Sequence, residues 1–418
     1  MTPTRALIAS ASEALSDTLR FSGPADQALS RHFRNHRDLG QAERAFVAET
    51  VFGALRRRRS LAMAAQSESP YSLVLACLVR VQGVPVRAVA DAVREKDLPL
   101  LERASAARPE DQPAAVQADV PDWLWARLVS EYGEGEARTI TQGLLAPAPM
   151  DLRANVFKAS RDAALDALRK AGLAGDATPY SPTGIRLAGK PAINRQPLFA
   201  DGSIEVQDEG SQLLAALVAP RRGEMVVDFC AGAGGKTLAL GALMRNTGRL
   251  YAFDVSAKRL AGLDPRLARS GLSNVHPVAI ASENDLRAKR LAGKIDRVLV
   301  DAPCSGFGTL RRNPDLKWRF DEKDVAELVE KQARILAGAA RLPRIGGRLV
   351  FATCSVLREE GEGIAATFLA AHLAYKQLSC AEILASQGIG LDTGINLRLF
   401  PHVHRTDGFF AAAFERVS

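Results

Sequence analysis

The sequence predicts three architectures in succession: an all-helical region, a small α+β unit, and a larger α/β domain built on a mostly parallel sheet. Three observations lead to this prediction. Apolar residues recur at helical spacing over the first hundred residues, the pattern changes near Met150, and strand-like runs alternate with helical stretches after about residue 204. Since 418 residues exceed one ordinary core, we expect domains at residues 1–120, 121–203 and 204–418.

The composition is that of a globular protein. Hydrophobic residues make up 47% and charged residues 24%, and no apolar run approaches the roughly 18 residues of a membrane span. The N-terminus predicts a first amphipathic helix rather than a targeting segment, because Glu13 and Asp17 interrupt it. Five cysteines without a CxxC pair argue against a zinc or disulfide framework, so we expect no metal and a cytoplasmic location.

Basic charge points to the kind of partner. The net charge of +8 and the pI near 9.4 favour a polyanion. Part of the excess is local, because Arg56 to Arg59 form one run. This run fits either a phosphate-contacting patch or a solvated helix end.

The elements of the first half can be assigned in order. Amphipathic spacing predicts helices around residues 6–15, 42–55 and 71–81, and a further helix that starts at Asp122. Residues 106–121 are rich in Ala, Pro, Asp and Gln and are expected to form a linker. Short strands at residues 151–155 and 185–187, with a helix at 161–171 between them, predict the small α+β unit.

The last domain contains strand-like runs at residues 225–227, 250–253, 277–280, 297–300, 348–351 and 409–414. Helical stretches separate most of them, which implies a parallel sheet with helices on both faces. In such sheets, ligands bind beyond the carboxyl ends of the strands. Because Asp228, Asp254, Asp301 and Cys354 each follow a strand, we expect them to gather on one rim.

Two cysteines carry the strongest chemical signal. One lies in VLVDAPCSGFGTLRRNPDLKW (298–318) and the other in GRLVFATCSV (347–356), each after a strand-like run. Either cysteine alone fits a buried structural residue, because free cysteine is among the most buried residue types. Together with Asp301, however, Cys304 and Cys354 supply a nucleophile, a second thiol and a carboxylate, which points to covalent catalysis.

A glycine-containing loop, VVDFCAGAGGKT (226–237), joins the first strand of this domain to a helix. Its glycines let the backbone approach a ligand, and the following helix offers N–H groups suited to an anion. The loop is neither GxGxxG nor a Walker A motif, because Cys230 stands where Walker A needs a glycine. Asp254, which closes the second strand, either holds ribose hydroxyls or caps the helix from Ala257 onward.

These motifs resemble the Sun/Nop2 family of RNA cytosine-5 methyltransferases, which use S-adenosylmethionine. The resemblance runs from about residue 204 to 418 and includes six motifs in order: VQDEGSQLLAALV, VVDFCAGAGGKT, FDVSAKRL, DAPCSGFGTLRRNPDLKW, FATCSVLREE and DGFFAA. Upstream, LGQAER (39–44) resembles the NusB-like domain of the bacterial 16S ribosomal-RNA members, and residues 151–167 resemble their small RRM-like RNA-binding unit. The resemblance therefore implies a Rossmann-like methyltransferase domain behind two RNA-binding units.

The resemblance also implies a role for each motif residue. Cys354 is the expected nucleophile toward carbon 6 of cytosine, Asp301 hydrogen-bonds the base, Cys304 assists proton removal and product release, and Lys236 orients these groups. Phosphate contacts are expected from Arg311, Arg312 and Lys317, with Trp318 or Phe307 as stacking surfaces. The implied cofactor-binding residues are Asp228, Cys230, Ala231, Gly232, Ala233, Gly234, Gly235, Lys236, Asp254, Arg259 and Asp301.

Three positions depart from the family pattern. Ala233 stands where the loop usually has proline, and Gly361 stands where an asparagine is usual. The acid that usually contacts adenosine after the third strand is absent at Ala281, with Glu283 and Asp285 as two substitutes. None of these departures removes a catalytic group.

Several alternatives stay open at the level of sequence. The target of the implied activity is 16S ribosomal RNA or, alternatively, transfer RNA, and nothing demands more than a monomer. A DNA cytosine-5 methyltransferase would use Cys304 as nucleophile, which would leave FATCSV without a purpose. A ribosome-assembly protein with an inactive methyltransferase domain is permitted by the basic charge, but the retained Asp301, Cys304 and Cys354 argue against it.

Overall fold

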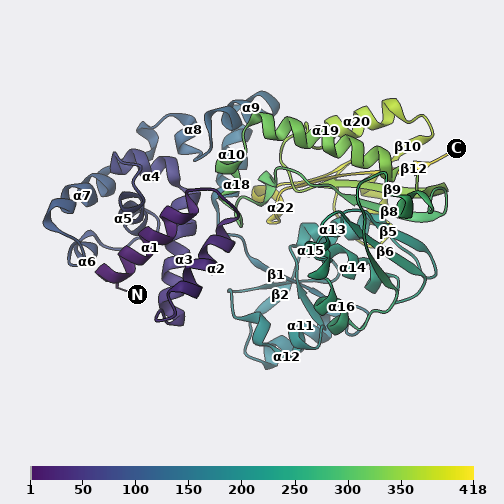
Figure 1. Cartoon of the computed structure of the whole chain (residues 1–418), viewed down its shortest axis with the longest axis horizontal. Helices are drawn as coiled ribbons and strands as arrows, with labels where there is room; N and C mark the ends of the chain where they lie inside the picture. Colours follow the sequence, from purple (N-terminus) through teal and green to yellow (C-terminus); the bar gives the residue numbers. More distant parts are fainter. Residues whose placement is uncertain (1) are drawn as a thin grey trace. The chain divides into compact units, whose positions relative to one another are not determined.

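The first third of the chain folds into helices because its apolar residues recur every three to four positions. The computed structural model describes residues 2–418 and divides into two units. The helical unit comprises the chain up to Pro147 together with Thr309–Lys323, and the sheet unit comprises Ala148–Gly308 and Asp324–Ser418. The two units are shown in Figure 1.

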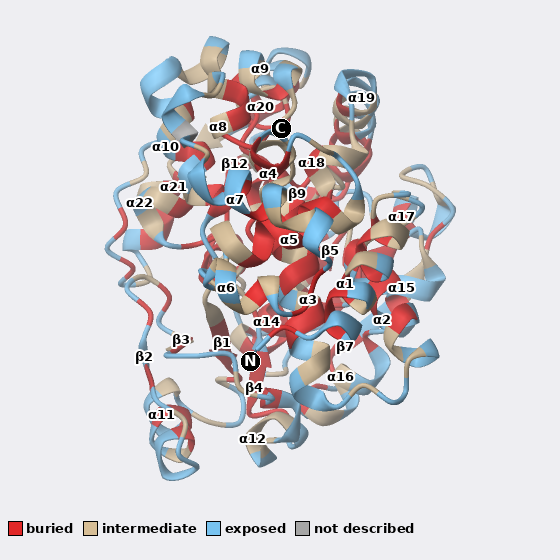
Figure 2. Ribbon diagram, turned by 90° about the vertical axis from the view of Figure 1, so that its left-hand side faces the viewer, coloured by how far each residue is buried: buried red, intermediate tan, exposed pale blue. Residues whose placement is uncertain are grey.

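The helical unit is organised around α5. Its helices are α1 (Arg5–Thr18), α2 (Ala25–Asn35), α3 (Gln41–Arg56), α4 (Arg58–Ala65), α5 (Pro70–Arg80), α6 (Val86–Ala90), α7 (Leu98–Ala106), α8 (Ala114–Gln117), α9 (Asp122–Tyr132), α10 (Glu134–Leu145) and α18 (Leu316–Arg319). Residues 73–78 of α5 are fully buried, and Figure 2 shows this helix in the colour of buried residues. A helix that is apolar on all sides belongs inside a bundle, so α1, α3, α4 and α7 pack around it.

The predicted linker at residues 106–121 is wrong, because part of this segment is packed. It contains the short helix α8, whose Ala115 and Val116 are buried. Asp119 is buried as well, and its carboxylate accepts hydrogen bonds from the backbone N–H and hydroxyl of Ser60 at 2.9 and 2.7 Å. Composition alone could not reveal this packing, because it depends on a partner about sixty residues earlier.

The arginine run at Arg56–Arg59 makes internal contacts. Arg58 pairs with Glu68 at 3.5 Å, and Arg59 pairs with Asp122 at 2.7 Å. Arg56 donates to the carbonyl of Arg311 at 3.1 Å. These arginines hold the helical unit together at the junction of α3 and α4.

The sheet unit begins with a small sheet of four strands in the order β2-β3-β1-β4. The strands are β1 (Met150–Ala154), β2 (Gly175–Ala177), β3 (Gly184–Leu187) and β4 (Ile204–Val206), with α11 (Arg161–Lys170) and α12 (Pro197–Ala200). The predicted strands and helix of this α+β unit are confirmed. Ile204, where we expected the last domain to begin, lies in β4 and pairs with β1.

The larger sheet has the order β10-β12-β9-β8-β5-β6-β7, with β11 paired to β12. Its strands are β5 (Met225–Asp228), β6 (Arg249–Asp254), β7 (Val275–Ala279), β8 (Ile295–Asp301), β9 (Pro343–Thr353), β10 (Tyr375–Leu378), β11 (Leu397–Leu399) and β12 (Phe409–Arg416). The five consecutive strands from β9 to β7 in this order are parallel, whereas β12 runs antiparallel to β9, β10 and β11. The mostly parallel α/β fold predicted from sequence is confirmed.

Alternation along the strands produces a core on each face of this sheet. Val226 and Val350 join the core under α13 (Glu209–Val218), α14 (Gly235–Leu243), α15 (Ala257–Ala261) and α21 (Cys380–Ala385). Val227 and Phe351, one residue further, join the core under α17 (Leu286–Lys289), α19 (Glu322–Ala339) and α20 (Glu362–Ala371). The remaining helices are α16 (Asp264–Ser270) and α22 (Pro401–His404). Each fully buried large apolar side chain contributes about 1.5–3 kcal/mol.

No helix among residues 2–418 combines the length and apolar character that a bilayer crossing demands.

Candidate active site

Acids and a cysteine end neighbouring strands of the larger sheet. Asp228, Asp254 and Asp301 are the last residues of β5, β6 and β8, and Cys354 directly follows β9. These strands are parallel, so their carboxyl ends share one edge of the sheet, as predicted. A cavity of about 490 Å³ opens at this edge, and the residues that line it include Cys230, Asp254, Arg259, Glu283, Asp301, Cys304 and Cys354.

Two thiols lie side by side in the lining of this cavity. The Sγ atoms of Cys304 and Cys354 lie 3.4 Å apart, and both cysteines are free. The hydrogen bond with Cys354, together with burial, raises the pKa of Cys304 well above its usual value. Cys304 is therefore a neutral thiol at pH 7.

A buried glutamate that the sequence analysis missed holds the Cys304 turn. Glu360 is fully buried and accepts hydrogen bonds from the backbone N–H of Ser305 at 2.8 Å and from its hydroxyl. Gln332 of α19 donates to the same carboxylate at 2.9 Å. The available signal was that Glu360 ends the FATCSVLREE motif, but only the tertiary fold shows that it reaches the other cysteine loop.

Lys236 and Asp301 form an ion pair beside the thiols. Their Nζ and Oδ2 atoms lie 2.7 Å apart, and both side chains are largely shielded from solvent. Burial lowers the pKa of Lys236, but the charge and hydrogen bond of Asp301 outweigh it, so the pKa lies above its usual value. The lysine is thus a fixed ammonium, and a thiolate at Cys354 would add to its stabilisation.

The glycine loop packs tightly against the end of β6. The N–H of Gly232 donates to the Oδ2 atom of Asp254 at 2.8 Å, and the Oδ1 atom accepts from the N–H of Ser256 at 2.7 Å. Gly232 has φ +56°, and an added Cβ would lie 2.5 Å from a guanidinium nitrogen of Arg259. Asp254 therefore shapes the loop and lines the cavity, whereas Ser256 is the N-cap of α15.

Asp228 supports the loop from below rather than lining the cavity. It is buried, and its Oδ2 atom accepts a hydrogen bond from the hydroxyl of Thr237 at 2.7 Å. Burial, reinforced by the charge of Asp301, raises the pKa of Asp228 to about 7. Of the other predicted cofactor residues, Cys230, Asp254, Arg259 and Asp301 line the cavity, whereas residues 231–236 are not among its described lining residues.

The structure distinguishes the two acids that could replace the usual one at Ala281. Glu283 lines the cavity. Asp285 is committed elsewhere, because it accepts from the N–H of Ala281 at 2.8 Å and pairs with Arg287 at 2.9 Å. Among the described residues, Glu283 is therefore the candidate for an adenosine contact.

The predicted phosphate contacts need correction. Lys317 is 1% exposed, and its Nζ atom donates to the carbonyl of Arg56 at 2.9 Å within the helical unit. Arg311 is also buried, while Arg312 is partly exposed. Trp318 donates its indole N–H to the carbonyl of Leu55 at 2.7 Å. Lys317 and Trp318 are thus structural residues of the helical unit, as their segment packs on the end of α3.

Two cations of α19 lie at the cavity instead. Lys331 and Arg334 line it, and both are exposed. They were missed because their spacing on an amphipathic helix is also typical of an ordinary solvated face.

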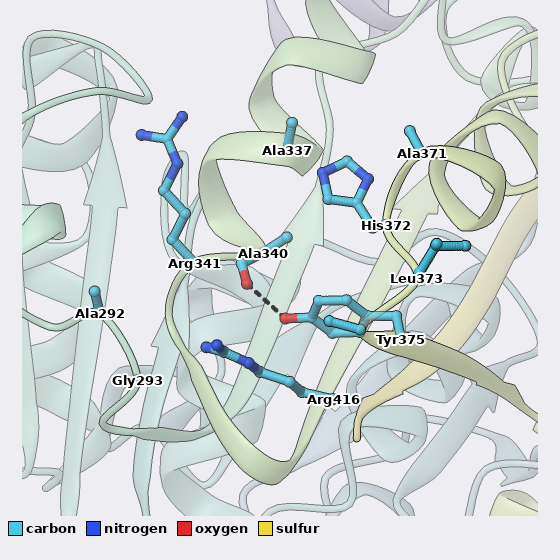
Figure 3. A pocket seen from close by; sticks show the side chains of 11 residues that line it. Ala292, Gly293, Ala337, Ala340, Arg341, Ala371, His372, Leu373, Tyr375 and Arg416 are labelled. Atoms are coloured by element: carbon cyan, nitrogen blue, oxygen red, sulfur yellow. Dashed lines mark hydrogen bonds between the residues drawn. The ribbon is translucent and has the colours of Figure 1, made fainter. Parts of the chain in front are cut away.

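A larger hollow lies at the opposite edge of the same sheet. It has a volume of about 810 Å³ and is lined by several alanines with Arg341, His372, Tyr375 and Arg416 (Figure 3). Neither a thiol nor a carboxylate occurs among the described residues that line it. Size is therefore a poor guide here, and the smaller cavity is the candidate active site.

Strand order, a glycine loop after β5 and an acid closing β6 define the class of this domain: a Rossmann-like methyltransferase. The chain belongs to the family described as 16S rRNA methyltransferase RsmB/F. The model of that family matches residues 215–415, and a model of its ferredoxin-like domain matches residues 120–194.

Individual relatives agree with this assignment. A probable ribosomal RNA small subunit methyltransferase B of Synechocystis sp. is 35% identical over 305 residues, which cover 72% of this chain and 67% of that protein. The matched segments of the first curated relatives span 57 to 67% of their length.

Solved structures share the fold. The crystal structure of PH0851 has a TM-score of 0.79 at 24% identity, with both chains covered completely. The structure of NSun6 from Pyrococcus horikoshii, solved with SFG, has a TM-score of 0.63 at 22% identity and covers 71% of this chain and 98% of its own.

Proposed function

We propose that this protein transfers a methyl group from S-adenosylmethionine to carbon 5 of a cytosine in 16S ribosomal RNA, through a covalent bond between Cys354 and carbon 6. The observation that carries this proposal is the thiol pair, with Sγ atoms 3.4 Å apart, beside the ion pair of Lys236 and Asp301. The names of the relatives support ribosomal RNA as substrate. Such a substrate agrees with the cytoplasmic location predicted from the cysteines.

The cavity has the donor set that this cofactor needs. Asp254 lines it at the position where α/β folds hold ribose hydroxyls, and Glu283, which lines it as well, would be the acid that contacts the adenosine. Phe229 and Ile280 supply apolar walls. When bound, S-adenosylmethionine supplies an electrophilic methyl group.

Covalent attack makes carbon 5 of cytosine nucleophilic. The Cys354 thiolate, stabilised by the nearby ammonium of Lys236, forms a bond to carbon 6 and shifts the ring electrons toward carbon 5. Nitrogen 3 takes a proton from the ammonium of Lys236, which the carboxylate of Asp301 holds in place, and this neutralises the adduct. Carbon 5 can then accept the methyl group.

Release of the methylated base requires a group that removes the proton of carbon 5. Cys304 becomes that base after Cys354 has reacted. Once Cys354 is bonded to carbon, the largest of the causes that raise the pKa of Cys304 is gone, although burial and the charge of Glu360 remain, and Cys304 loses its proton to solvent. The Cys304 thiolate then takes the proton of carbon 5, the bond between sulfur and carbon 6 breaks, and nitrogen 3 returns its proton to the ion pair. The ring regains its double bond and Cys354 is free again.

The base must leave its stack to reach this rim, so the substrate is a single-stranded or locally opened segment. Lys331 and Arg334 at the cavity are placed to meet its phosphates. They would make the phosphate contacts that the sequence had suggested for Lys317.

Separate replacement of the two cysteines tests the mechanism. With methyl donor and a small-subunit RNA transcript, Cys304→Ala is expected to accumulate a protein–RNA adduct on denaturing gels, because release fails. Cys354→Ala should form no adduct, and Cys380→Ala, at a buried position away from the cavity, should behave like the unaltered protein. Capture by Cys354→Ala but not by Cys304→Ala would assign the nucleophile to Cys304, as in DNA cytosine-5 methyltransferases.

Two further measurements address the remaining alternatives. Bisulfite mapping of cellular RNA with and without the gene should show one lost 5-methylcytosine in 16S ribosomal RNA, whereas loss in transfer RNA would move the target there. Calorimetry with S-adenosylmethionine should give measurable heat. Absence of binding would favour an RNA-binding assembly protein with an inactive domain.

A further inference from the structure

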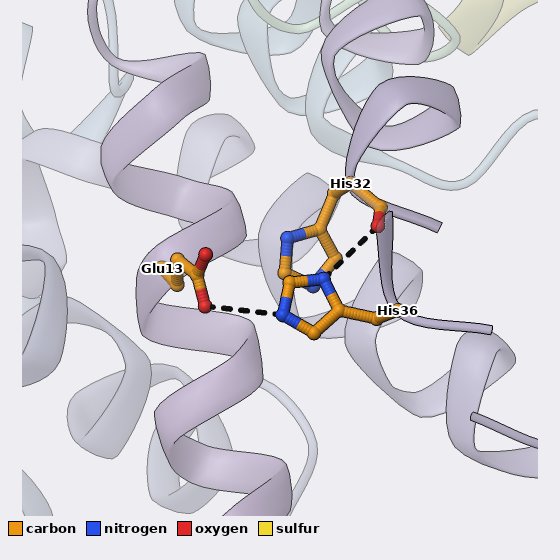
Figure 4. Close-up of side chains that lie close together, drawn as sticks. All are labelled: Glu13, His32 and His36. Carbon is orange, nitrogen blue, oxygen red and sulfur yellow. Dashed lines mark hydrogen bonds and ion pairs between the residues drawn. The ribbon is translucent and has the colours of Figure 1, made fainter. Parts of the chain in front are cut away.

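Three side chains converge in the helical unit, on the two helices α1 and α2. Glu13 comes from α1, and His32 and His36 come from the last turn of α2 and its C-cap. One ligand atom of each lies within 4.8 Å of the other two. Figure 4 shows both imidazole rings beside the carboxylate of Glu13, with one nitrogen of each ring toward it.

Each ring already uses its other nitrogen. The Nδ1 atom of His36 lies 3.0 Å from the carbonyl oxygen of His32, so it must carry a hydrogen and donate. The Nε2 atom of His32 lies 2.9 Å from the hydroxyl of Ser10. In the neutral ring of His36 the remaining Nε2 atom therefore bears a lone pair. Fixing one nitrogen by an outer hydrogen bond is how proteins orient a metal-binding histidine.

The distance between Glu13 and His36 fits an ion between them. The Nε2 atom lies 3.4 Å from the Oε2 atom, which is longer than the ~2.7–3.2 Å of a direct N–H···O hydrogen bond. Two ligands bound to zinc at ~2.0–2.1 Å with a tetrahedral angle are about 3.4 Å apart. The two rings are stacked with centroids 4.1 Å apart and planes at 25°, so the His32 ring has to turn about its side-chain bonds before its nitrogen can point at the same ion as a third ligand.

We propose that Glu13, His32 and His36 bind a divalent transition-metal ion, and their donor atoms suit zinc. Two imidazoles and one carboxylate are ligands that zinc accepts, and water completes the coordination. Glu13 is exposed, so its side chain can adjust to the ion. The site links α1 to α2, because its ligands come from both helices.

The cysteine pattern could not predict this site. Its ligands are two histidines four positions apart and a glutamate nineteen residues earlier, and an isolated pair of histidines on a helix is more often satisfied by hydrogen bonds. The inference does not depend on the proposed methyl transfer.

Metal content of the full-length chain tests the proposal. Cys304 and Cys354 could themselves bind zinc, so the measurements use Cys304→Ser/Cys354→Ser. After dialysis against zinc and then buffer, mass spectrometry should find one zinc per chain. In this background, Glu13→Gln and His36→Gln should each weaken zinc binding in calorimetry at least tenfold, whereas His276→Gln, which removes an exposed histidine elsewhere, should leave it unchanged.

Cobalt identifies the ligands independently. Co²⁺ should give visible bands of a nitrogen and oxygen site, without thiolate-to-metal charge transfer. Absence of zinc from the thiol-free protein, or unchanged affinity in Glu13→Gln and His36→Gln, would overturn the proposal. Glu13→Gln alters an exposed side chain only, so its circular dichroism should match the parent, and the comparison stays valid even if His36→Gln fails to fold.

Discussion

At the scale of single residues, the rim is a set of groups whose proton occupancy is set by their neighbours. Cys304 is kept neutral by Cys354 and by burial, while Lys236 is kept charged by Asp301. Asp228 lies one layer deeper, where burial favours its protonated form. The groups proposed to act in catalysis are therefore distinguished by environment as well as by residue type.

Asp228 makes a specific prediction about stability and pH. Its pKa is about 7 in the folded state against 3.8 for the ordinary group, so the folded protein binds more protons between these values. The contribution of Asp228 to the free energy of unfolding is complete below pH 3.8 and is lost as the pH rises through 7. Asp228→Asn abolishes this loss. When the pH is raised from 5 to 8, the free energy of unfolding of the variant should therefore increase, relative to that of the unaltered protein, by on the order of 2–3 kcal/mol.

Urea unfolding at both pH values measures this difference. Asp264→Asn, on the exposed first turn of α16, is the control for losing one carboxylate. If Asp228→Asn followed the control, its carboxyl group would not be held protonated by the fold.

The residues at the carboxyl ends of the strands could be predicted from the sequence, but the buried residues that hold them in place could not. Asp301 and Cys354 follow apolar strands, and parallel strands bring such ends together whatever the details of packing. Glu360 has no such pattern, since its role arises only when α19 and the Cys304 turn meet around it. The prediction that Lys317 contacts phosphate was wrong for a related reason, because a charged residue in a sequence motif can still be buried.

At the scale of elements, the Cys304 loop is held against the end of β9 by backbone contacts. The N–H of Gly308 donates to the carbonyl of Cys354 at 2.9 Å, and the N–H of Gly408 donates to the carbonyl of Gly308 at 2.8 Å. A Cβ on Gly308 would lie 2.0 Å from the carbonyl oxygen of Gly408. The approach of these two loops thus requires glycine.

Gly308→Ala should therefore move the Cys304 loop away from Cys354. We expect a loss of about 1–3 kcal/mol in unfolding free energy from overpacking, and a fall of about 10²-fold in methylation rate from the displaced thiol. Gly390→Ala is the matched control, because its Cβ would meet open space. Equal methylation rates in the two variants, measured with labelled methyl donor, would show that the loop does not need this close contact.

Strands and long helices were predictable because their periodicity is local, whereas the membership of elements in units was not. The strands expected at 250–253 and 297–300 appear as β6 and β8. Thr309–Lys323 contains the second half of the Cys304 motif, yet it belongs to the helical unit. That outcome depends on contacts with residues more than 250 positions earlier, which no local pattern encodes.

At the scale of the whole molecule, the chain enters the helical unit twice. In the second passage, Asp315 accepts a hydrogen bond at 3.3 Å from the N–H of Ala25, at the start of α2. Lys317 and Trp318 bind the last carbonyls of α3. Burial lowers the pKa of Lys317 to about 7, opposed by the charge of Asp119. The helical unit is therefore completed by a segment that the sequence of the methyltransferase domain supplies.

Cutting the chain between the two passages should not free the helical unit. A protease site inserted between Ala146 and Pro147, which are exposed, would give fragments 1–146 and 147–418. We expect these fragments to co-elute in native size-exclusion chromatography, because the second fragment carries the segment buried in the first, and to separate in denaturant. The same cleavage in Lys317→Ala/Trp318→Ala should release the fragments, because the hydrogen bonds to α3 and the buried indole are lost. Separation of the cleaved parent protein under native conditions would show instead that residues 309–323 are not needed to complete the helical unit.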